Sequence, residues 1–147
     1  MLLLLFCAVG QMPAAAFDHS TFVGIWKFQK KQLIAKATTY TLLMEDGSCS
    51  QASKVSVVGT THWLTGQCTW SIEGATFSMK IIASSDQDLV GTSTTARIES
   101  LSDETFVYEK DGKLETWERE LSLPAEFAPR LPPVDGPRPG AAATPRE

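Results

Sequence analysis

The sequence has few residues of the kinds that bind metals. Its 147 residues include three cysteines and two histidines, His19 and His62, whereas a structural zinc site takes about four such ligands at one place in the fold. The stretch Asp86-Gln87-Asp88 supplies two carboxylates, and a calcium site needs about six to eight oxygen ligands. We therefore expect neither a metal site nor a cofactor.

Positive charge is also scarce. Lys and Arg number 13 against 17 Asp and Glu, which gives a formal net charge of −4. Nucleic-acid binding depends on a concentration of Lys and Arg, so we expect no nucleic-acid partner. The one basic cluster contains Lys27, Lys30, Lys31 and Lys36. A solvated strand end is the favoured interpretation of this cluster, and a site for an anionic ligand or a membrane headgroup is the alternative.

No apolar run is long enough to cross a membrane as a helix. The longest, Leu2–Val9 at the N-terminus, has about half of the ~20 residues that a transmembrane helix needs. Ala14-Ala15-Ala16 then supplies the A-x-A pattern of a signal-peptidase site. We predict a signal peptide over residues 1–16 and a periplasmic or secreted protein. No Lys or Arg precedes the run, and an uncleaved apolar first strand is the alternative.

Catalytic motifs are missing as well. The sequence contains no nucleophile elbow, P-loop or zinc-protease motif. Asp18-His19-Ser20 has the residue types of a catalytic triad, but adjacent positions cannot converge as triad residues do. This stretch is typical of a cap or a tight turn. We expect that the protein is not an enzyme.

Between residues 17 and 121 the sequence consists of short runs with apolar residues at every second position, which is typical of β-strands. Turn signals such as Glu45-Asp46-Gly47 and Asp111-Gly112 separate the runs, and only residues 32–36 could hold a helical turn. Successive hairpins form a meander, which protects its edges best by closing. We predict an all-β domain, an antiparallel up-and-down barrel of about eight strands. The predicted strands are residues 22–30, 38–44, 48–57, 63–72, 76–82, 90–101, 105–109 and 114–120.

Two cysteines remain once residues 1–16, which contain Cys7, are removed. Cys49 and Cys68 in an exported domain predict one disulfide. They lie on neighbouring predicted strands, and pairing them leaves Val58-Gly59 as the hairpin turn. Valine is a poor residue for the positive φ that such a turn often needs, so a longer loop with a shifted register is the alternative.

Proline, alanine and glycine dominate the sequence from residue 122 onward, and seven of the eight prolines lie there. Such a segment buries too little apolar surface to offset the entropy of ordering it. We predict that residues 122–147 are a disordered tail. A spacer or a proline-motif ligand is the alternative interpretation.

Connection lengths predict one closed end and one open end. The turns after the second, fourth and sixth strands are tight, whereas the connections after the first, third and fifth strands are longer. On the second strand we expect Tyr40, Leu42 and Met44 to face inward. The large number of inward apolar side chains indicates a mostly filled core with a shallow cup. A ligand entering the mouth would meet nine inward positions: Phe28, Lys30, Tyr40, His62, Leu64, Ile81, Thr92, Thr94 and Tyr108.

The first and last strands carry a recognisable combination. Gly24-Ile25-Trp26, together with Arg119, resembles the signature of the calycins, which include lipocalins, fatty-acid-binding proteins and avidins. The phrases YTLLMEDGSC and TWER also look like those of bacterial lipocalin-like domains. The resemblance covers residues 22–120 and implies that Trp26 fills the closed end while Arg119 packs across it. Gly24 would allow close backbone approach there. The alternative is that Trp26 is ordinary core and Arg119 a surface charge.

Three functions stay open. The resemblance implies a carrier of a small apolar or amphipathic ligand in the cell envelope. A protein-binding barrel is the second, similar to small bacterial inhibitors of secreted metalloproteases. Those inhibitors insert an N-terminal arm into the protease, and the corresponding arm here, residues 17–21, is short. A non-catalytic envelope scaffold is the third. In each case we expect a monomer without a transmembrane span.

Overall fold

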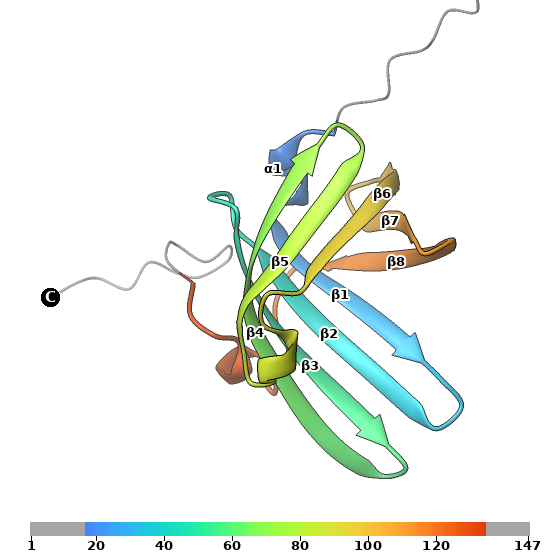
Figure 1. The fold of residues 1–147 in the computed structure, drawn as a ribbon, viewed down its shortest axis with the longest axis vertical. Helices are drawn as coiled ribbons and strands as arrows, with labels where there is room; N and C mark the ends of the chain where they lie inside the picture. Colours follow the sequence, from blue (N-terminus) through green and yellow to red (C-terminus); the bar gives the residue numbers. More distant parts are fainter. Residues whose placement is uncertain (1–16, 135–147) are drawn as a thin grey trace, which may run out of the picture.

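The computed structural model describes residues 17–134, and the predicted signal peptide lies outside them. A four-residue helix, α1 (His19–Phe22), precedes eight strands, and short 3-10 helices η1 (Gln87–Leu89) and η2 (Ala128–Arg130) follow β5 and β8. Each strand pairs antiparallel with the next, and β1 pairs with β8, so the sheet closes into a barrel (Figure 1). This confirms the predicted all-β, eight-stranded up-and-down fold. The strands are β1 (Gly24–Lys31), β2 (Ala35–Leu43), β3 (Ser48–Val57), β4 (Thr60–Glu73), β5 (Thr76–Ser84), β6 (Ser93–Leu101), β7 (Thr105–Lys110) and β8 (Lys113–Glu120).

Long strands, rather than long loops, form most of the open end. The β1–β2 hairpin continues to a tight turn in which Gln32 and Ala35 exchange backbone hydrogen bonds of 2.8 and 3.4 Å. The tip is Leu33-Ile34. Residues 32–36, the only segment that could hold a helical turn, form a hairpin turn instead, because extending the ladder adds hydrogen bonds while an isolated helical turn is costly to nucleate. Strands β3 and β4 are likewise joined only by Val58-Gly59. Of the three connections expected to be longer, the one between β5 and β6, which contains η1, is longer.

The predicted disulfide is present. Cys49 and Cys68 lie opposite each other on β3 and β4 and are bonded. The register leaves the two-residue turn Val58-Gly59, with φ values of 46° and 79°. Positive φ at both positions matches the twist of a hairpin, so the predicted register holds despite the valine.

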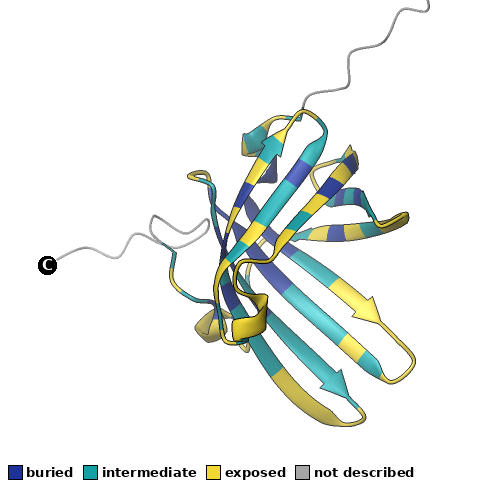
Figure 2. Ribbon diagram, in the orientation of Figure 1, coloured by how far each residue is buried: buried dark blue, intermediate teal, exposed yellow. Residues whose placement is uncertain are grey.

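Two apolar layers line the two faces of the β1–β4 sheet. Leu43 lies opposite Gly24 and Cys49 inside the barrel. Its neighbours Leu42 and Met44 therefore point outward, as does Tyr40, and the expectation that these three face inward is wrong. Figure 2 shows the buried stretches near the closed end and the exposed hairpin tips. The interior cluster contains Phe22, Trp26, Leu43, Cys49, Cys68, Trp70, Phe77, Ala96, Ile98, Phe106, Tyr108 and Trp117.

The chain after β8 covers the outer apolar layer. We call residues 121–134 the C-terminal strap. Phe127 and Leu131 of the strap are 3% and 4% exposed and belong to a cluster with outward-facing residues of β1, β2 and β3. The Ser50 hydroxyl donates to the carbonyl of Pro132 at 2.7 Å, and the Gln67 amide donates to that of Pro133 at 2.6 Å. The prediction of a disordered tail is therefore wrong for residues 122–134, and residues 135–147 lie outside the described part of the chain.

Candidate functional site at the open end of the barrel

The closed end is filled by Trp26 and the residues around it. Trp26 is fully buried, and its indole nitrogen donates to the backbone carbonyl of Phe22 at 2.7 Å. The ring of Phe22 meets that of Phe106 edge-on at 5.0 Å between centroids, and Phe77 packs against both. A turn of helix, α1, closes this end from outside, and Asp18 caps it by accepting from the Ser20 N–H at 3.0 Å. No room for a ligand is left among these rings.

Arg119 of β8 covers the closed end and bonds to the chain that precedes β1. Its guanidinium carbon lies 4.3 Å from the centroid of the Trp26 ring, a cation–π distance. The same guanidinium donates to the Val23 carbonyl at 2.9 Å and to the Thr21 carbonyl. Gly24 has a φ of 141°, and a Cβ there would lie 2.7 Å from an Arg119 nitrogen. The positive φ therefore favours glycine at position 24, and a side chain there would also displace the guanidinium from Trp26. Arg119 is part of the closed end and not a surface charge.

At the other end the barrel opens between β1 and β8. Their pairing covers Ile25–Lys27 and Glu118–Glu120, and β1 then continues with Phe28 while β8 runs back to Lys113. Figure 1 shows β1–β4 extending away from the shorter β6–β8. On the inner face of these projecting hairpins, Lys30 and His62 are exposed.

Three aromatic side chains form one wall of the mouth. Phe28 and Trp117 lie 6.3 Å apart and Tyr108 and Trp117 5.9 Å apart, measured between ring centroids. The Trp117 indole donates to the Tyr108 hydroxyl at 3.1 Å, and that hydroxyl donates to the Glu115 carboxylate at 2.5 Å. Burial, followed by the bond to Glu115, raises the pKa of Tyr108, so the phenol stays protonated. Tyr108 and Trp117 are only 6% and 5% exposed, so Phe28, which is partly buried, is the most accessible ring of the three, and the polar atoms of the other two satisfy one another.

The opposite wall of the mouth combines aliphatic and amide side chains. Leu64 and Ile81 line a cavity of about 60 Å³ that also touches Gln51 and Leu89. The Gln51 amide nitrogen lies 3.5 Å from the Met79 sulfur. Pockets for drug-sized ligands are about 300–1,000 Å³, so this cavity admits only part of such a molecule. The interior is a shallow cup, as the sequence indicates.

A second hollow lies outside the barrel, between the C-terminal strap and the sheet. It has a volume of about 340 Å³. Lys54 pairs there with Glu126 at 2.9 Å, and Lys27 lies 4.0 Å from Glu120. Its lining is mostly polar: Lys27, Gln29, Lys36, Thr38, Tyr40, Lys54, Ser56, Pro124, Glu126 and Phe127.

No protein-family model and no curated protein matches the sequence. Among solved structures, a crystal structure of a lipocalin-like protein from Bacteroides uniformis is similar at 15% sequence identity, with a TM-score of 0.41. The match covers 68% of this chain and 99% of that one. The fold type follows from two observations. The eight strands form a closed up-and-down meander, and Trp26 fills one end of it beneath Arg119. The barrel is lipocalin-like.

The lipocalin-like barrel brings together five of the nine positions predicted for a ligand. They lie on the inner face by register and are Phe28, Leu64, Ile81, Thr94 and Tyr108. Lys30 and His62 occupy the same face but sit exposed toward the hairpin tips. Thr92 is exposed in the β5–β6 connection, where its hydroxyl donates to the Leu89 carbonyl at 2.7 Å.

Tyr40 is the predicted ligand position that lies elsewhere. Its ring packs 4.4 Å from that of Phe127 on the outer face, beside the outer hollow. Sequence reasoning also missed Trp117 in the mouth. The signal was available, because Trp117 stands two residues before Arg119 on a strand and must share its face.

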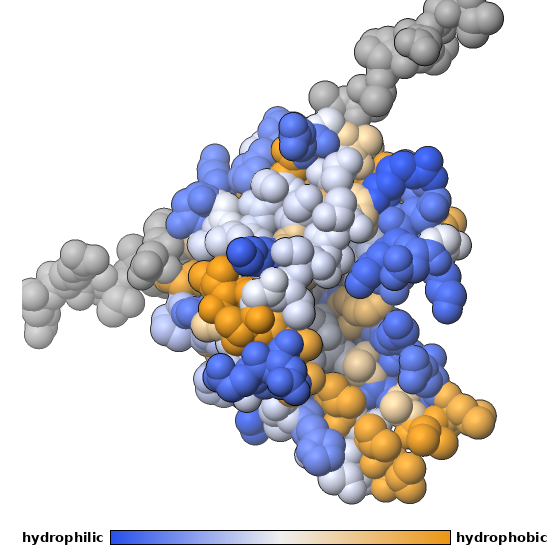
Figure 3. Space-filling model, in the orientation of Figure 1, coloured by the Kyte–Doolittle hydropathy of each residue, from blue (hydrophilic) through white to orange (hydrophobic). Residues whose placement is uncertain are grey.

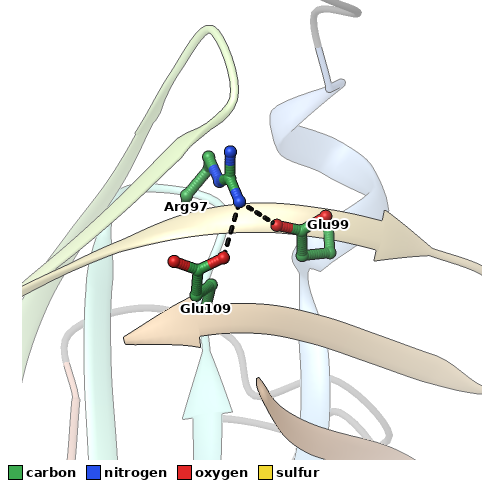
Figure 4. Close-up of polar contacts among 3 residues, drawn as sticks. All are labelled: Arg97, Glu99 and Glu109. Atoms are coloured by element: carbon green, nitrogen blue, oxygen red, sulfur yellow. Dashed lines mark hydrogen bonds and ion pairs between the residues drawn. The ribbon is translucent and has the colours of Figure 1, made fainter. Parts of the chain in front are cut away.

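Charged groups elsewhere on the described barrel form surface contacts. Arg97 bridges Glu99 and Glu109 at 2.5 and 2.6 Å on the outer face of β6 and β7 (Figure 4). All three side chains are more than a third exposed, so they belong to the solvated surface. Within residues 17–134, no cluster of three His, Cys, Asp or Glu side chains could hold a metal ion. None of the helices in that part of the chain is long and apolar enough to span a membrane.

Proposed function

We propose that this lipocalin-like protein is an exported, non-catalytic barrel that binds a small apolar or amphipathic molecule across its open end. The observation that carries the proposal is the short pairing of β1 with β8, beyond which Phe28 packs against the buried rings of Trp117 and Tyr108. On the same inner face, Leu64 and Ile81 line a small cavity. Apolar walls with a few fixed polar groups are typical of small-molecule sites. The disulfide supports a periplasmic or secreted location, where such bonds persist.

The shape of the cup limits how a ligand can bind. Because the closed end is filled and the inner cavity measures about 60 Å³, the apolar body would lie along the aromatic wall near the rim. A polar head would then face Lys30 and His62, which are exposed at the lip. A carboxylate or phosphate head suits the ammonium of Lys30.

Binding of an environment-sensitive apolar dye, displaced by candidate ligands, tests this proposal. Phe28→Ala and Leu64→Ala should each weaken dye binding about tenfold, which corresponds to the loss of one good apolar contact. Tyr40→Ala is the matched control, because Tyr40 lies on the outer face, and it should leave the affinity unchanged. Mass spectrometry of protein purified from its native host should show a retained ligand. If no apolar dye binds, or if only Tyr40→Ala weakens binding, the proposed site is wrong.

The protein-binding alternative has less support. An inhibitor that inserts its N-terminal arm needs that arm free, yet Phe17 packs 6.3 Å from Phe22, measured between ring centroids. The Thr21 carbonyl is held by Arg119. The arm therefore belongs to the closed end. Failure of every apolar probe would make this alternative the leading hypothesis.

A further inference from the structure

The two hairpins that extend beyond the barrel end in exposed apolar tips. Leu33 and Ile34 of the β1–β2 tip are 102% and 65% exposed, and Val58 of the β3–β4 tip is 78% exposed. The two tips are neighbours and share a shallow hollow lined by residues of both turns. Figure 3 shows this apolar patch at the lower right, at the far end of the hairpins. Contiguous exposed apolar surface at a projecting end marks a docking site.

Val58 occupies its turn at a cost to the backbone. Its φ is 46°, a conformation that disfavours β-branched residues, and a turn of this kind prefers Asn, Asp or Gly. The Val58 side chain is 78% exposed and therefore contributes little to the packing of the barrel. Strain held at an exposed position is a reason to look for a function of the side chain.

Two lysines flank the β1–β2 tip. Lys31 and Lys36 face each other directly across the β1–β2 hairpin, an arrangement of like charges that destabilises a sheet. From Lys27 to Met44 and from Gly47 to Ile72 the sequence contains no Asp or Glu, although the whole chain has a net charge of −4. The projecting ends of the β1–β2 and β3–β4 hairpins therefore contain lysines and no acidic residue of their own.

We propose that the hairpin tips insert into the interface of an anionic lipid bilayer. A projecting apolar end flanked by two lysines complements the apolar core and negative headgroups of such a membrane. A second copy of the chain is a poor occupant, since two tips would bring Lys31 and Lys36 of each copy together. The proposal does not depend on the ligand proposed for the mouth.

Vesicle flotation with the full chain tests the proposal. The protein should float with vesicles of phosphatidylcholine mixed with phosphatidylglycerol, bind vesicles of phosphatidylcholine alone more weakly, and be released by high salt. Leu33→Ser/Ile34→Ser should weaken binding at least about tenfold, because two inserted side chains are lost. Lys31→Gln/Lys36→Gln should weaken binding to the anionic vesicles about fivefold per lysine.

Matched controls remove residues of the same kinds from other parts of the surface. Leu114 and Leu121 are 66% and 96% exposed, and Leu114→Ser/Leu121→Ser should bind as the wild type does. Lys80 is exposed on β5, and Lys80→Gln should also have little effect. Equal binding by the wild type and the Leu33→Ser/Ile34→Ser variant would overturn the proposal, as would self-association of the wild type through the tips without vesicle binding.

Two further variants locate the contact and separate it from folding. A Leu33→Trp variant should gain fluorescence that shifts to the blue with anionic vesicles and is quenched by brominated lipids. Val58→Asn should raise the thermal midpoint, since it relieves the strained turn, and weaken vesicle binding at the same time. A residue kept only for structure would not show these opposite effects. An unquenched Trp at position 33 contradicts insertion.

Discussion

Trp26 is the side chain on which the closed end depends most. It is fully buried, bonded through its indole to the Phe22 carbonyl and covered by Arg119. Trp26→Ala would leave a large cavity, and we expect the free energy of unfolding to fall by about 3–5 kcal/mol. Urea denaturation measures this change. Trp63→Ala serves for comparison, because Trp63 lies partly exposed on the outer face and should cost less.

The Cys49–Cys68 bond closes a loop between neighbouring strands with a sequence separation of 19. Constraining the unfolded chain over that length contributes about 3 kcal/mol. Reduction, or Cys49→Ala/Cys68→Ala, should therefore lower the urea midpoint without changing the fold. Thiol titration of denatured, unreduced protein processed at residue 16 should find no free thiol, and two reactive thiols would refute the pairing.

Both tyrosines of the chain predict a loss of stability in alkali. Burial is the main cause that raises the pKa values of Tyr40 and Tyr108. The negative charges of Glu120 and Glu126 raise the pKa of Tyr40 further, and the hydrogen bond and charge of Glu115 raise that of Tyr108 further. Above pH ~10 the unfolded chain releases these protons while the folded chain keeps them. The unfolded state then binds fewer protons, so the free energy of unfolding falls as pH rises.

Urea unfolding at a series of pH values up to about 11 measures this fall. Tyr108→Phe should be less stable than the wild type at neutral pH, because the hydrogen bonds to Trp117 and Glu115 are lost. It should also lose less stability in alkali. An identical slope in the variant would mean that Tyr108 ionises normally in the folded protein.

At the scale of elements, the C-terminal strap contributes to stability. Phe127 packs on Tyr40 and Trp63, with ring centroids 4.4 and 5.0 Å away, and Arg130 lies 3.9 Å from the Trp63 ring. Truncation after Leu121 should lower the thermal midpoint and shift Trp63 fluorescence to the red. Truncation after Val134 keeps the strap and is the control. Phe127→Ala should cost about 3 kcal/mol; no effect from either change would mean that the strap does not stabilise the barrel.

Strand β2 shows why the predicted site contained one misplaced residue. Both of its faces are apolar, with Leu43 buried inside and Tyr40, Leu42 and Met44 buried outside. Period-two reasoning assumes that the more apolar face points inward. Here the strap covers the outer face, and its contacts arise from a proline-rich segment whose composition gives no sign of burial. Tertiary contact between distant segments overrode the local pattern.

The hairpins that form the barrel were far easier to predict. Turn signals such as Glu45-Asp46-Gly47, and the alternation of apolar residues between successive turns, predicted the strands. The predicted bounds of β3, residues 48–57, are those observed, and the other strands differ by a few residues. The open end was harder. Its β1–β2 strands extend past the predicted bounds because residues 32–36 carry no turn signal of their own, and continuing the ladder pairs their backbone groups with one another.

At the scale of the whole molecule, the closed barrel followed from edge protection and the Trp26–Arg119 pair. The space left inside the barrel could not be predicted from the sequence. How much space remains depends on how Phe28, Trp117 and Gln51 pack across strands, and such packing involves rotamers that a period-two pattern does not contain. Most of the nine residues predicted for the mouth therefore lie on the inner face of the sheet, but their pattern in the sequence does not predict the volume of the cavity.

The seam of the barrel also sets the order in which the molecule can form. Ile25–Lys27 pairs with Glu118–Glu120, so the contact that closes the sheet joins the first strand to the last. Contacts so far apart in sequence carry the largest loop-closure entropy and form slowly. A nascent chain lacks β8 until the seven preceding strands have been made, and until then its inner aromatic face has no covering strand. Closure is thus a late event in folding, finished when Arg119 arrives over Trp26.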